Sequence, residues 1–115
     1  MDTFENTDRC VICGASSYEK KYYFNQEFSK LPDRVKDTLQ IICVEFTEKC
    51  GGVFTIEFDE DGDLKLVTDA EEVDAMYDEI GAELEIKNLR NTQAELFEEL
   101  TLFYKVVFLG EKIEI

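Results

Sequence analysis

The sequence predicts an α+β fold in which a small antiparallel sheet packs against two or three helices. Two strand regions, an N-terminal segment and a later hairpin, show alternation of apolar and polar residues. Residues 33–50 and the last third of the chain instead carry apolar residues at helical spacing. The chain has 115 residues, of which 44% are hydrophobic. We therefore expect a single domain over residues 1–115, with residues 1–8 frayed.

The first distinctive segment is CVICG, in which Cys10 and Cys13 have the spacing of a zinc knuckle. A four-thiolate site needs a second such pair, but Cys43 and Cys50 lie about 10.5 Å apart along a predicted helix. A redox pair would need a helix N-terminus, whereas a strand follows here. We expect a short segment that turns at Gly14, with two incidental thiols and neither metal nor cofactor. A thiol or zinc protein using the CVICG pair is the less favoured alternative.

The next two elements have clear local signals. In YEKKYYF, Tyr18, Tyr22 and Phe24 share one face, which predicts a strand over residues 18–24. Pro32 is typical of a helix start and Gly51 of a helix end, which predicts a helix between them.

The segment VFTIEFDEDGDLKLVTD predicts a hairpin over residues 53–67, with its turn at Asp61 and Gly62. Glu57, Asp59 and Asp61 also match the first positions of a calcium-binding loop. The twelfth position is a threonine, however, where that loop needs a bidentate glutamate. We therefore expect a hairpin tip with solvated acidic side chains.

A short helix is predicted after the hairpin, because Thr68 and Glu71 have the spacing of a capping box and Gly81 can end or bend it. Its inward-facing residues would be Val73, Met76, Tyr77 and Ile80.

The last third of the chain contains a shift of helical phase. Ile80 and Leu84 lie on one side of an ideal helix, and the later apolar residues lie on the opposite side. We expect a break near residues 81–85 and a second helix from Ile86, with a start at Thr92 as the alternative. The segment YKVVFL is compatible with either helix or strand.

The charge of the chain is −15, and it is uneven. Residues 1–56 carry 9 acids and 7 bases, whereas residues 57–115 carry 18 acids and 5 bases. Such a surface repels phosphate backbones and anionic membranes, so we expect no direct binding to nucleic acid or membrane. The acids can serve solubility, or they can form a docking face for a basic partner.

Two absences bear on function. The sequence contains no histidine, which removes histidine-based catalysis, and it shows no recognisable catalytic constellation. We therefore expect no enzyme and name no catalytic residue. No apolar run is long enough to span a bilayer, and the acidic start is unlike a secretory signal, so we expect a cytoplasmic protein.

The segments YEKKYYFN, LPDRVKDTLQIICVEFTE, GGVFTIEFDEDG and MYDEIG resemble those of a family of small acidic bacterial proteins of unknown function. The resemblance extends over residues 13–110. It implies a bacterial cytosolic protein without an assigned activity, and it transfers no catalytic residue.

The favoured function is a non-enzymatic module that binds a protein partner or a second copy of itself. A homodimer would form through the wide apolar stripe of the C-terminal helix, at Leu96, Phe97, Leu100 and Tyr104. A broad core explains the same stripe equally well. The alternative function is an acidic mimic of nucleic acid that occupies a basic partner.

Overall fold

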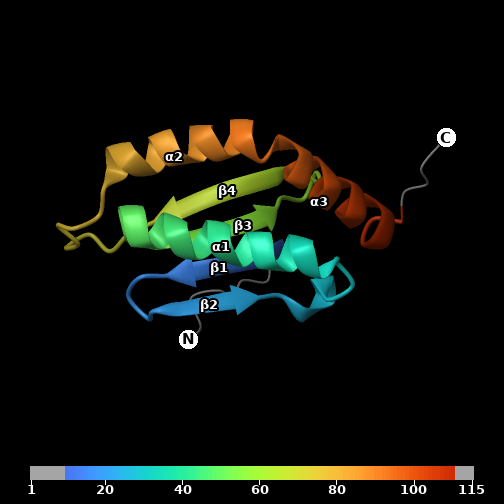
Figure 1. Ribbon diagram of the computed structural model, residues 1–115, viewed down its shortest axis with the longest axis horizontal. Coiled ribbons are helices and arrows are strands. Elements are labelled where there is room, and N and C mark those ends of the chain that lie inside the picture. Colours follow the sequence, from blue (N-terminus) through green and yellow to red (C-terminus); the bar gives the residue numbers. More distant parts are fainter. Residues whose placement is uncertain (1–9, 111–115) are drawn as a thin grey trace.

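The computed structural model describes residues 10–110, which form a four-stranded antiparallel sheet and three α-helices (Figure 1). The strands are β1 (Cys10–Ser16), β2 (Lys21–Phe24), β3 (Val53–Phe58) and β4 (Leu64–Asp69), in the spatial order β2-β1-β3-β4. The helices are α1 (Asp33–Cys50), α2 (Glu79–Thr92) and α3 (Ala94–Val107), with a 3-10 turn η1 at Gln26–Phe28. The predicted α+β class is confirmed, and the frayed residues 1–8 lie outside the described part.

The expected turn at Gly14 is wrong, because this residue lies inside the central strand β1. Gly14 pairs with Tyr23 of β2 on one side and with Thr55 of β3 on the other. Val11 and Ile12 favour a strand, but the glycine, alanine and serine at the end of CVICGAS have little intrinsic strand preference. Backbone hydrogen bonds to β2 on one side and to β3 on the other hold these residues in the strand conformation.

A bulge in β1 decides where the CVICG thiols point. The pairing with β3 is irregular between Val11 and Cys13, so that Cys10 lies opposite Phe58 and Cys13 opposite Ile56. Because side chains alternate along a strand, a regular strand would place the two cysteines on opposite faces. The bulge instead turns both toward the helices.

The hydrophobic core lies between one face of the sheet and the helices. Phe54, Ile56 and Phe58 alternate along β3 toward this side and are fully buried. Helix α1 begins after Pro32 and ends before Gly51, as predicted, and stacks Phe46 on Phe54 with ring centroids 4.1 Å apart. Figure 1 shows α1 and α2 running in opposite directions over the sheet.

The break between α2 and α3 lies at Gln93, so the expected break near residues 81–85 and the expected start at Ile86 are wrong. The alternative start at Thr92 is close to the observed one. The chain resolves the phase shift differently, because Ile80 and Leu84 simply face outward. Helix α3 continues to Val107, so most of YKVVFL is helical.

The short helix predicted after the hairpin is also wrong, because residues 70–78 form no regular helix. Thr68 and Asp69 extend β4 by pairing with Phe54 and Val53, and they are therefore not helix caps. The actual cap of α2 is Asp78, whose carboxylate accepts a hydrogen bond from the amide of Gly81 at 2.8 Å.

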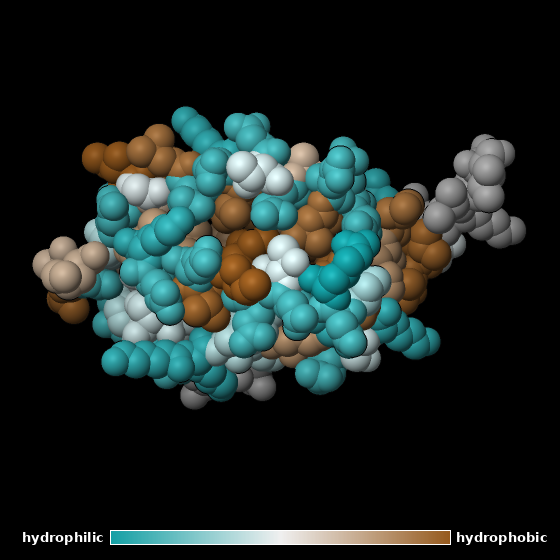
Figure 2. Space-filling model, viewed as in Figure 1, coloured by the Kyte–Doolittle hydropathy of each residue, from teal (hydrophilic) through white to brown (hydrophobic). Residues whose placement is uncertain are grey.

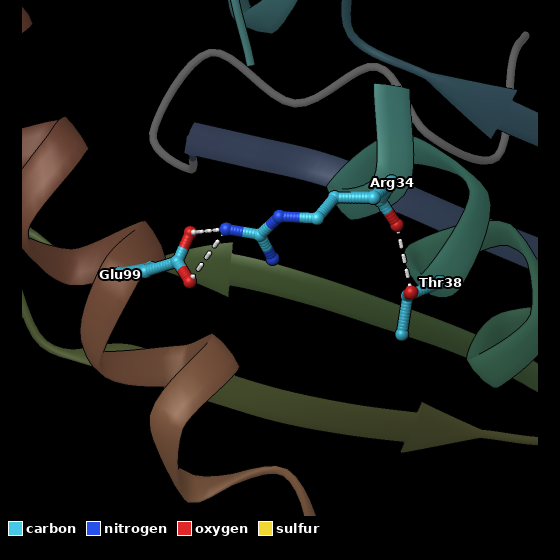
Figure 3. Close-up of polar contacts among 3 residues, drawn as sticks. All are labelled: Arg34, Thr38 and Glu99. Carbon is cyan, nitrogen blue, oxygen red and sulfur yellow. Dashed lines mark hydrogen bonds and ion pairs between the residues drawn. The ribbon is translucent and has the colours of Figure 1, made fainter. Parts of the chain in front are cut away.

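Contacts far apart in sequence hold α3 in place. Phe58 stacks on Tyr104 at 4.1 Å and Phe28 on Phe108 at 4.6 Å, which anchors the end of α3 to β3 and η1. On the surface, one guanidinium nitrogen of Arg34 lies 3.1 Å from both carboxylate oxygens of Glu99 and so links α1 to α3 (Figure 3). None of the helices described between residues 10 and 110 combines the length and apolar character that a membrane crossing requires.

Candidate functional site

The segment between β4 and α2, residues 70–78, is here called the connector. The side chain of Tyr18, from the β1–β2 turn, holds its first half. The Tyr18 hydroxyl donates to the Asp74 carboxylate at 2.5 Å and accepts from the Glu71 amide at 3.0 Å. Asp74 also accepts from the amide of Met76 at 2.9 Å. The connector therefore has a defined path although it contains no helix.

Tyr77 holds the second half of the connector against the double glycine that follows α1. Its hydroxyl lies 2.9 Å from Thr68 Oγ1, and the neighbouring Asp78 amide donates to the Cys50 carbonyl at 2.9 Å. A Cβ atom at Gly52 would lie 2.4 Å from the Asp69 carbonyl oxygen and 3.0 Å from the Tyr77 ring. Only glycine leaves room for this approach, and its positive φ of 71° is one that glycine adopts freely.

The anchored connector and the first turns of α2 expose apolar side chains. Their exposed fractions are 89% for Val73, 87% for Met76, 75% for Ile80 and 62% for Leu84. Ile80 and Leu84 are four residues apart on α2 and so lie on one face of the helix. Figure 2 shows apolar surface at this end of the molecule, where Figure 1 places the connector and the start of α2.

Carboxylates surround a hollow of about 480 Å³ at the same place. The acidic residues that line it are Asp69, Glu71, Glu72, Asp74, Glu79 and Glu83, and no basic residue between residues 10 and 110 lines it. The pKa of Asp74 lies below its ordinary value, mainly because the Tyr18 hydroxyl donates a hydrogen bond to the ionised carboxylate. We call these six acids, together with Val73, Met76, Ile80 and Leu84, the acidic–apolar surface.

The structure places Cys10 and Cys13 beside different helices. The Cys13 sulfur lies 3.7 Å from the sulfur of Cys43 on α1, and both thiols are fully buried. Cys10 is close to the hydroxyl of Tyr104 on α3, and burial followed by the charge of Glu27 raises its pKa. The bulge thus brings the CVICG thiols to one face of the sheet, Cys10 beside α3 and Cys13 beside α1.

The hairpin tip holds the one group of three candidate metal ligands that converge within residues 10–110. Carboxylate oxygens of Asp59, Asp61 and Asp63 all lie within 4.8 Å of one another. Asp59 Oδ1 accepts hydrogen bonds from the amides of Asp63 at 3.0 Å and Asp61 at 2.9 Å, and these, the Asp63 amide first, lower the pKa of the Asp59 carboxyl. This carboxylate therefore serves the turn itself, in the hairpin that the sequence predicts.

The four residues predicted to form a dimer contact all lie in the core of the chain. Leu96, Phe97, Leu100 and Tyr104 belong to the same cluster as the β3 side chains. Within this cluster Tyr104 stacks on Phe58, and Leu100 is fully buried. The apolar stripe of α3 is therefore part of a broad core, which the sequence also allowed. The exposed apolar residues of α3 are Leu102, Val106 and Val107.

Sequence reasoning missed the acidic–apolar surface, because it placed Val73, Met76 and Ile80 in the core. A signal was nevertheless present. Between Lys65 and Lys87 the chain has eight acids and no base. A stretch of this charge is costly to bury, so its apolar residues are drawn to the surface with it.

Comparison with curated proteins and with solved structures found no match. A family model described as a family of unknown function (DUF6145) matches residues 9–112, which is most of the chain. The resemblance to a family of unknown function is therefore confirmed, and the chain belongs to this family.

Proposed function

We propose that the chain is a non-enzymatic interaction module whose acidic–apolar surface binds a basic segment of a partner protein. One observation carries the proposal. Four largely exposed apolar side chains stand beside a hollow lined by six carboxylates and no base. A partner with lysine or arginine next to apolar residues is complementary to both parts of this surface.

The two parts of the surface would contribute differently to binding. Fully burying a side chain such as that of Met76 or Leu84 contributes about 1.5–3 kcal/mol. The carboxylates attract a basic partner and raise its rate of encounter, and this contribution weakens as salt screens the charges. The aliphatic stems of lysine and arginine can also pack on Val73 and Ile80 while their charged ends reach the acids.

The state of the thiols supports a non-enzymatic role. Contact with Cys13 and burial together raise the pKa of Cys43, and burial raises the pKa of Cys10 and of Cys50. A nucleophilic cysteine needs the opposite shift, because the thiolate is the reactive form. With no histidine in the chain, no imidazole is present to act as a general base.

A synthetic peptide rich in lysine and leucine tests the proposal, with binding followed by calorimetry and by amide shifts in NMR spectra. The site variant combines Glu71→Gln, Glu72→Gln and Glu83→Gln. We expect it to weaken binding at least threefold at low salt, at roughly 0.2–1 kcal/mol for each exposed charge pair. We expect Met76→Ser to weaken binding about tenfold at any salt concentration, since it removes apolar contact.

Matched controls separate this site from a general effect of charge. The charge control combines Asp37→Asn, Glu45→Gln and Glu95→Gln, which removes three exposed acids elsewhere and gives the same net charge. The apolar control is Ile41→Ser, an exposed residue of α1. Equal weakening by the site and control variants would contradict the proposal. A response to charge alone, with Met76→Ser silent, would instead favour the acidic mimic.

A further inference from the structure

A second hollow, of about 620 Å³, lies between the start of β4, the end of α2 and one side of α3. Leu64, Phe97 and Leu102 supply apolar parts of its lining. Lys65 of β4, Arg90 of α2 and Lys105 of α3 also line it. Three elements therefore each bring one cation to the same place.

This gathering of cations is unusual for so acidic a part of the chain. Residues 57–110 contain sixteen acids and only four bases. Three of the four bases line the hollow, and Lys87 is the exception. Only two of the sixteen acids, Asp63 and Glu98, line it. The lining of the hollow thus holds three cations and two acids, whereas the rest of residues 57–110 holds fourteen acids and one base.

The cations keep most of their hydrogen-bonding capacity for a ligand. One terminal nitrogen of Arg90 donates to the Leu64 carbonyl at 3.2 Å, which positions the guanidinium and leaves its other donors available. Lys65 Nζ lies 3.7 Å from an Asp59 oxygen, in a loose and half-exposed pair. Lys105 forms no ion pair with any residue of the described range 10–110, and its stem runs beside Gly62 of the hairpin turn.

We propose that this hollow binds a small organic anion that carries phosphate or carboxylate groups. The planar fork of Arg90 matches the paired oxygens of either group. Lys65 and Lys105 add point charges from two other elements, and Leu102, which is 50% exposed, offers apolar contact to the remainder of the ligand. Such a division between a few placed polar groups and an apolar wall is typical of small-molecule sites.

The anion site is separate from the proposed partner surface. The acidic–apolar surface lies at the start of α2, whereas the cationic hollow lies at the end of α2 and along α3 (Figure 1). The two surfaces share no lining residue. The proposal of an anion site and the proposal of a partner surface can therefore be tested independently of each other.

The test is an NMR titration of the ¹⁵N-labelled full chain with inorganic pyrophosphate and, separately, with citrate, each against sodium chloride at matched ionic strength. We expect saturable shifts at residues 63–65, 90 and 97–105. Lys65→Gln and Lys105→Gln should each weaken binding about tenfold, because each removes a hydrogen bond between charged groups. Lys105→Arg should retain binding, because it keeps the charge.

Lys87→Gln is the matched control, because it removes an exposed cation that does not line the hollow. It should leave the affinity unchanged. Equal weakening by Lys87→Gln and Lys105→Gln would overturn the proposal, and so would the lack of a saturable shift at millimolar concentrations of both probes. Tighter binding of pyrophosphate would support the proposal and identify phosphoryl ligands, whereas tighter binding of citrate would support it and identify carboxylates.

Discussion

Tyr18 shows how a single side chain can organise a distant segment. It lies in the turn between β1 and β2, yet its hydroxyl contacts the connector at Asp74 and Glu71. A hydrogen bond to an ionised carboxylate is stronger than one between neutral groups. The same contact favours the charged form of Asp74 and so lowers its pKa.

Replacing this hydroxyl gives a direct test at the residue scale. In Tyr18→Phe we expect the pKa of Asp74 to rise toward its ordinary value, as measured by NMR titration of the carboxyl carbon. A lowered pKa stabilises the folded state above the ordinary pKa, and this contribution is lost as pH falls through the folded value. The free energy of unfolding of Tyr18→Phe should therefore fall less steeply than that of the native chain as the pH is lowered through the acid range.

Tyr22→Phe is the control for this titration. The Tyr22 hydroxyl is buried and has no hydrogen-bond partner among residues 10–110, so its removal should leave Asp74 unchanged. The proposed anchoring of the connector would be wrong if the pKa of Asp74 were the same in Tyr18→Phe as in the native chain.

At the scale of elements, α3 has one face that packs into the core and one that is exposed. Its inner face carries Leu96, Phe97, Leu100 and Tyr104 into the core. Its outer face exposes Leu102 and Val106 to different degrees. The ion pair of Arg34 with Glu99 adds little to this packing, because exposed pairs contribute about 0–1 kcal/mol.

Two leucines of α3 form a matched pair for testing this assignment. Leu100 has no exposed surface, whereas Leu102 is 50% exposed. We expect Leu100→Ala to lower the free energy of unfolding by about 2–5 kcal/mol, since it leaves a cavity. Leu102→Ala should change it by about 0.5 kcal/mol or less. Chemical denaturation measures both, and a tolerated Leu100→Ala would show that this face is not core.

At the scale of the whole molecule, charge opposes self-association. Each copy carries a net charge of −15, so two copies repel one another, most strongly at low ionic strength. We expect a monomer in sedimentation velocity experiments at micromolar concentration and low salt. A dimer under these conditions would contradict this expectation and would direct attention to Leu102 and Val106 on the outer face of α3.

The parts of the fold that the sequence predicts are those with local signals. Pro32 and Gly51 bound α1 because one suits a helix start and the other a helix end. Asp61 and Gly62 mark the hairpin turn, where Gly62 adopts a φ of 83°. These residues determine their own backbone conformation, so no knowledge of distant contacts is needed.

The parts that the sequence does not predict depend on distant partners. Gly14 is in a strand because it pairs with β2 and β3. The residues of CVICG do not indicate that these two strands will lie beside them. Thr68 and Glu71 have capping-box spacing, but pairing of Thr68 with Phe54 extends β4 instead. Tertiary pairing outweighs a local preference at both places.

The candidate site was predictable only in its charge. The acidic excess of residues 57–115 indicates a docking face for a basic partner, and the structure gathers six of these acids around one hollow. The exposure of Val73 and Met76 was not predictable, because their spacing also fits an amphipathic helix. The cationic hollow depends on β4, α2 and α3 meeting, which spacing alone cannot show.

The anchored connector also has a consequence for how such a chain can diverge. The residues that hold it in place, Tyr18, Gly52 and Tyr77, are different from those it displays, Val73 and Met76. Substitutions at the displayed positions touch neither the anchors nor the core, so they carry little cost in stability. The partner surface that we propose can therefore change from one descendant to the next while the scaffold stays the same.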